Sequence, residues 1–141
     1  MKALTFLSTR QSAAIAVLAL TLASGAALAA DTKLTGAQEV PPVKTSASGN
    51  EAIKVSPDGS VSGSVTTKGV DATMAHIHHG AAGSNGPVII PLKKEGSDKW
   101  MVPADAKLTA EQMKAYREGN LYVNVHSEAH KGGEIRDQLA P

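Results

Sequence analysis

The feature that most constrains the fold is a period-two alternation of apolar and polar residues, repeated along the chain. It is strictest at residues 121–126 (LYVNVH), and shorter alternations occur at 53–55 and 61–66. The last two are separated by the turn sequence PDG at 57–59. Because successive side chains of a strand point to opposite faces, this pattern predicts half-buried strands of an antiparallel sheet, with a hairpin over 50–67.

The remaining elements fit the same architecture. Further strands are expected at 73–78, at 88–92, where Pro91 marks an edge or a strand end, and at 133–139. One helix is expected near 109–118, because Thr109 and Gln112 form a capping box and Gly119 suits its end. The sequence therefore predicts an all-β domain, an antiparallel Greek-key-like β-sandwich or barrel with one short helix.

The N-terminus has the pattern of a secretory signal peptide. Lys2 and Arg10 provide a basic start, an apolar run covers 13–22, and small residues lead to Ala27-Leu28-Ala29. The apolar run is shorter than the roughly 20 residues of a membrane span. We expect a cleaved signal peptide over 1–29, with cleavage after Ala30 as the alternative. The mature chain, 30–141, is then one exported domain, periplasmic or secreted.

Charge and cysteine content exclude several functions. Loss of the two basic residues of the signal peptide changes the formal net charge from +1 to −1, which argues against nucleic-acid binding. No basic amphipathic segment indicates membrane binding after cleavage. The chain contains no cysteine, which excludes disulfides, thiol catalysis and iron–sulfur sites. No nucleophile elbow or suitably spaced carboxylate pair indicates hydrolysis, so an enzymatic role is uncertain and disfavoured.

The segment MAHIHHG at 74–80 contains three of the five histidines. His76 and His78 share one face of their strand, and His126 lies on the polar face of the strand at 121–126. If the two strands are neighbours, three imidazoles converge, a donor set suited to Zn²⁺ or Cu²⁺. Met74 shares the face, and its thioether favours Cu⁺, so copper is the first candidate and zinc the second. The alternative is an ordinary polar strand surface without an ion, with Met74 filling a packing gap.

Two other segments have open interpretations. Residues 38–43 (QEVPPV) are predicted to be extended. They form either an edge strand protected by proline or an exposed edge that binds a ligand or a protein partner. Glu134 and Arg136 share a strand face, where they form an ion pair or Glu134 orients a histidine. His79 and His130 adjoin turns and are expected to face solvent.

Several motifs occur in order along the chain: residues 34–43 (LTGAQEVPPV), 75–78 (AHIH), Gly80, Gly83, 85–88 (NGPV), 119–127 (GNLYVNVHS) and 132–136 (GGEIR). Together they resemble one family, the chordin-type (CHRD) domain, over about residues 33–139. The resemblance implies a β-rich extracellular domain and little about activity. Asp137 departs from the family pattern, which typically has glycine after the arginine.

The histidine strands are also similar to the copper-ligand strands of copper/zinc superoxide dismutases. That likeness implies His76, His78 and His126 as copper ligands, but the chain lacks the cysteine pair and the zinc-ligand cluster of those enzymes. The leading function is an exported copper-binding protein, with Met74 as a further ligand, acting in storage, delivery or protection and not in turnover. The alternative is a metal-free module that binds a protein partner, and the third is a copper-site redox enzyme of the superoxide dismutase-like type.

Overall fold

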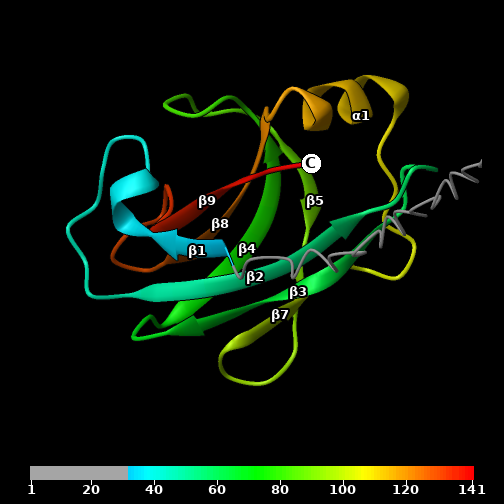
Figure 1. The fold of residues 1–141 in the computed structure, drawn as a ribbon. Helices are drawn as coiled ribbons and strands as arrows, with labels where there is room; N and C mark the ends of the chain where they lie inside the picture. The colour runs from blue at the N-terminus through cyan, green and yellow to red at the C-terminus, as the bar shows by residue number, and fades with distance from the viewer. Residues whose placement is uncertain (1–31) are drawn as a thin grey trace, which may run out of the picture.

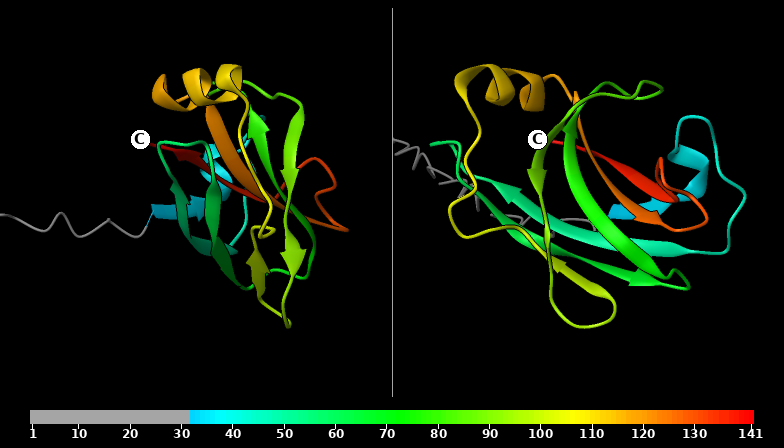
Figure 2. Two further views of the ribbon diagram at one scale, coloured as in Figure 1. Left: turned by 90° about the vertical axis from the view of Figure 1, so that its right-hand side faces the viewer. Right: turned by 180° about the vertical axis from the view of Figure 1, so that it is seen from behind.

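A computed structural model describes residues 32–141, so the predicted signal peptide lies outside the described residues. Nine antiparallel strands in this range form one sheet that curls into a nearly closed barrel (Figures 1 and 2). The helix α1 lies over one end of the barrel. The strands are β1 (Thr32–Thr35), β2 (Ser48–Val55), β3 (Val61–Lys68), β4 (Ala72–His79), β5 (Val88–Pro91), β6 (Lys93–Lys94), β7 (Lys99–Met101), β8 (Leu121–Ser127) and β9 (Ile135–Leu139).

The strand order places segments that are distant in the sequence next to each other. It runs β5-β4-β8-β9-β1-β2-β3-β7-β6, so β1 lies between β2 and β9. The chain leaves β3 and enters β4 in another part of the sheet, where β4 pairs with β8 along almost its full length. The predicted all-β antiparallel fold is confirmed, and its strand order brings the two histidine-bearing strands together.

The barrel interior is filled by the apolar half of each alternating strand. Leu34, Val65, Ile77, Val123 and Ile135 are almost completely buried, and they come from five different strands. Burying a side chain of this size contributes about 1.5–3 kcal/mol. Because these residues face inward, their polar neighbours along each strand face outward, and this fixes which side of β4 and β8 carries the histidines.

The predicted helix is confirmed as α1 (Ala110–Arg117). The Thr109 side chain accepts a hydrogen bond from the Gln112 amide, and the Gln112 side chain accepts one from the Thr109 amide. This reciprocal capping box satisfies two amides that the first turn leaves without helical partners. No helix among residues 32–141 has the length and apolar character needed to cross a bilayer.

The prediction of an extended edge at 38–43 is wrong. The 3₁₀ helix η1 (Gly36–Gln38) begins this segment, and the Val40–Pro41 peptide bond is cis. The carbonyl of Gly36 accepts hydrogen bonds from the amides of Glu39 and Val43, which closes the segment into a loop. Because the two prolines have no amide hydrogen to donate to a strand ladder, the loop takes the place of a strand.

Candidate functional site

The candidate site lies on the outer face of β4 and β8. Strand register places Met74 directly across from His126, His76 across from Asn124, and His78 across from Tyr122. Residues in register share a face of the sheet. The condition set by the sequence, that the strands be neighbours, is therefore met.

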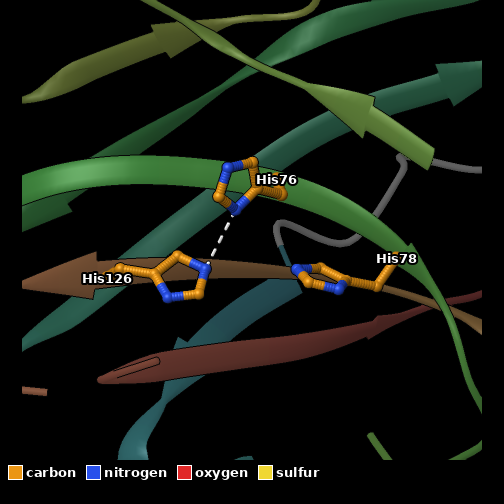
Figure 3. Close-up of side chains that lie close together, drawn as sticks. All are labelled: His76, His78 and His126. Carbon is orange, nitrogen blue, oxygen red and sulfur yellow. Dashed lines mark hydrogen bonds between the residues drawn. The ribbon is translucent and has the colours of Figure 1, made fainter. Parts of the chain in front are cut away.

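The three histidines converge above the two strands (Figure 3). Each offers one ring nitrogen, and these nitrogens lie within 4.8 Å of one another. Nδ1 of His76 lies 3.0 Å from Nε2 of His126. In a tetrahedral Zn²⁺ site with bonds of about 2.0–2.1 Å, two ligand nitrogens lie about 3.3 Å apart. For all three rings to bind one ion, the most widely separated ring nitrogens would have to approach by about 1.5 Å, a movement that side-chain rotation can supply, so the three histidines could hold a metal.

Backbone carbonyl groups fix the proton positions on two of the rings. Nδ1 of His78 lies 2.9 Å from the carbonyl oxygen of Gly86, and Nδ1 of His126 lies 2.9 Å from that of Lys131. Because a carbonyl oxygen only accepts, both Nδ1 atoms carry hydrogen and both Nε2 atoms present a lone pair. Such outer hydrogen bonds orient the imidazoles of metal sites. Nδ1–H of His76 donates to Nε2 of His126. If Nδ1 of His76 bound an ion, its proton would move to Nε2 of the same ring, so that the ring stayed neutral.

Burial keeps two of the rings uncharged. Burial and the neighbouring rings of His126 and His78 lower the pKa of His76 to about 4. Burial also lowers the pKa of His78, although its hydrogen bond to Gly86 opposes this. Both rings are therefore neutral at neutral pH, which is the state that binds a metal ion.

The rest of the site is held by the loop between β4 and β5 and by aromatic stacking. A Cβ on Gly86 would lie 1.7 Å from the carbonyl oxygen of His79, so only glycine lets the loop approach closely enough to hydrogen-bond His78. The Tyr122 ring stacks on the His78 ring at 4.7 Å between centroids and 5° between planes. The Arg136 guanidinium lies 3.4 Å from the centroid of the Tyr122 ring. These contacts immobilise His78 before any ion is bound.

The predicted pairing of Glu134 with Arg136 is wrong. The Glu134 carboxylate accepts hydrogen bonds from the hydroxyls of Ser127 and Thr45, at 2.5 and 2.6 Å. Those bonds lower its pKa although burial opposes them. Glu134 thus holds the loop after β8, whose Lys131 carbonyl orients His126, and no hydrogen bond between Glu134 and a histidine ring is found in the described chain.

Sequence reasoning did not assign a role to Asn124 or Glu39. Asn124 is 2% exposed and lies in register between His76 on β4 and Arg136 on β9. Glu39 is 3% exposed and lies beside a hollow of about 400 Å³. The sequence could have indicated Asn124, because the alternation of 121–126 places its side chain on the same strand face as His126. No such indication existed for Glu39, because it reaches the site from the loop after η1.

The sequence model of the CHRD domain matches residues 30–139, which is most of the chain. The chain belongs to the CHRD domain family. Comparison with the curated proteins and with the solved structures gave no match. The family resemblance seen in the sequence is thus confirmed, and the site of this CHRD domain must be interpreted from its own geometry.

Proposed function

We propose that this CHRD domain is an exported metal-binding protein that holds one copper ion between His76, His78 and His126. It stores, delivers or sequesters the ion and does not catalyse a reaction. One observation carries the proposal: Nε2 of His78 is buried, points at the other two rings and has no hydrogen-bond partner among residues 32–141. A buried polar atom without a partner is costly, and an ion at this position would satisfy it. CHRD domains occur in extracellular proteins, which supports export.

Copper is favoured over zinc by two considerations. A given set of nitrogen ligands binds Cu²⁺ more tightly than Zn²⁺ along the Irving–Williams order. Met74 lies across from His126 on the same face and is 47% exposed, so its thioether is available to Cu⁺ at the entrance of the site. We propose Met74 as an additional ligand for the reduced ion.

A metal titration of the full chain tests the proposal. The chelator-stripped protein is titrated with Cu²⁺ and Zn²⁺ in parallel with His126→Gln and His79→Gln, and circular dichroism verifies the fold of each. His79 is the matched control because it lies on β4 but outside the cluster. We expect one ion per chain, with an affinity at least about 100-fold weaker in His126→Gln and unchanged in His79→Gln.

Equal binding by the wild type and His126→Gln would exclude the three-histidine site. Absence of binding by the wild type would overturn the metal function. The polar face of β4 and β8 would then be tested as a metal-free surface for a protein partner.

A further inference from the structure

Asn124 occupies the central position of the face that carries the histidines. It lies directly across from His76 on β4 and from Arg136 on β9. Along β8 it is flanked on the same face by Tyr122 and His126. The Asn124 side chain therefore lies on the same face as the three histidines, next to His126 along β8 and across from His76 on β4.

The side-chain oxygen of Asn124 is buried and has no hydrogen-bond partner in the described part of the chain. The same is true of Nε2 of His78. Two buried acceptor atoms on the same face of β4 and β8 that lack a donor would both be satisfied by a bound cation.

The amide nitrogen of Asn124 is directed elsewhere, toward Glu39. A Cβ on Gly133 would lie 2.6 Å from Nδ2 of Asn124 and 2.4 Å from Oε1 of Glu39, so both atoms lie against the same glycine. With its nitrogen facing the carboxyl, Asn124 presents its oxygen to the histidines.

We propose that Asn124 is the fourth ligand residue of the centre, supplying its side-chain oxygen to the bound ion, and that Glu39 is a positioning residue that fixes the amide orientation. This inference rests on the proposed metal function. A donor set of three imidazoles and one amide oxygen suits Cu²⁺ and Zn²⁺ better than Cu⁺, because hard oxygen ligands favour the divalent ions. The centre would therefore bind the oxidised ion through Asn124 and release this contact on reduction.

Substitutions of Asn124 in the full chain test this assignment. Asn124→Leu removes the oxygen but keeps the branched shape of the side chain, and Asn124→Asp retains an oxygen. Asn50→Leu is a control on the exposed side of β2. Affinities for Cu²⁺, Zn²⁺ and Cu⁺ are measured by chelator competition. We expect Asn124→Leu to bind Cu²⁺ and Zn²⁺ about 10- to 100-fold more weakly with Cu⁺ affinity unchanged. Asn124→Asp should bind the divalent ions at least as tightly as the wild type.

A second pair of variants covers the case in which Asn124→Leu does not fold. Glu39→Met removes the carboxyl that lies beside the amide nitrogen and should weaken Cu²⁺ binding, whereas Glu39→Gln keeps a side-chain oxygen at that position and should not. Cu²⁺ binding by Asn124→Leu at wild-type affinity would overturn the assignment, as would equal losses for all three ions. If His126→Gln loses the ion while Asn124→Leu keeps it, only this inference fails. If the wild type binds no ion, both it and the proposed function fail.

Discussion

The burial of Glu39 leads to a prediction about stability and pH. Its carboxyl is nearly excluded from solvent, and burial raises its pKa from 4.5 to about 7. Arg136, Asn124 and the Val40 amide each lower this pKa, but together they do not offset the loss of hydration. Between pH 4.5 and 7 the folded chain therefore holds a proton that the unfolded chain has released. The contribution of Glu39 to the free energy of unfolding must fall as pH rises through this window.

The magnitude follows from the shift in pKa. A shift of two and a half units corresponds to about 3.4 kcal/mol at full effect. An interval from pH 5 to pH 8 covers most of this, and residual hydration of the carboxyl reduces it. We therefore expect the stability of Glu39→Gln relative to the wild type to increase by about 1–2.5 kcal/mol over that interval, because the glutamine amide does not titrate.

Urea denaturation of both proteins at pH 5, 6, 7 and 8, followed by circular dichroism, measures this difference. The comparison must be between the two proteins, since the lowered pKa of His76, about 4, changes the wild-type stability in the opposite direction. That effect is common to both and cancels in the difference. A difference that stays constant within about 0.3 kcal/mol from pH 5 to 8 would refute the assignment of a buried, protonated Glu39.

Three further predictions concern other parts of the molecule. Gly133→Ala should lower the free energy of unfolding by about 2–4 kcal/mol, because φ is +127° and the new Cβ would overlap two buried polar atoms. Gly132→Ala has open space around the new Cβ and should change the free energy of unfolding by less than about 0.5 kcal/mol. Urea denaturation measures both. Thr109→Ala should cost about 1 kcal/mol through loss of the capping box, and Thr109→Ser should restore it, in the same assay. Zinc at about 100 times its dissociation constant should raise the free energy of unfolding of the wild type by about 2.7 kcal/mol and also raise its melting temperature. His79→Gln should show the same increase, and His126→Gln should show none.

The sequence was sufficient to predict the elements whose pattern is local. Period-two alternation identified β2, β3, β4 and β8, and the capping box identified α1 within one residue at each end. The same alternation placed the histidines on the outer face, because the apolar residues between them had to face the core. The pairing of β4 with β8 was only a condition in that reasoning, since periodicity specifies the faces of a strand but not its neighbour.

The features that were missed depend on contacts between distant segments. The loop after η1 was expected to be extended, yet its carbonyl and amide groups close on Gly36 and bring Glu39 beneath Asn124. Glu134 and Arg136 were expected to pair because they share a strand face. In the folded chain, Ser127 and Thr45 offer hydroxyl donors to Glu134, and Tyr122 offers a ring face to Arg136. None of these partners can be recognised from residue spacing.

The strand order has a consequence for how long an ion would remain bound. β5 lies at one end of the sheet order and pairs with β4, which carries two of the three histidines, whereas His126 belongs to β8, between β4 and β9. An ion would therefore cross-link the terminal β4–β5 hairpin to β8, the third strand in the sheet order. Its residence time would be limited by the local opening of that hairpin, and hydrogen exchange of the β4 and β5 amides should slow when the site is filled.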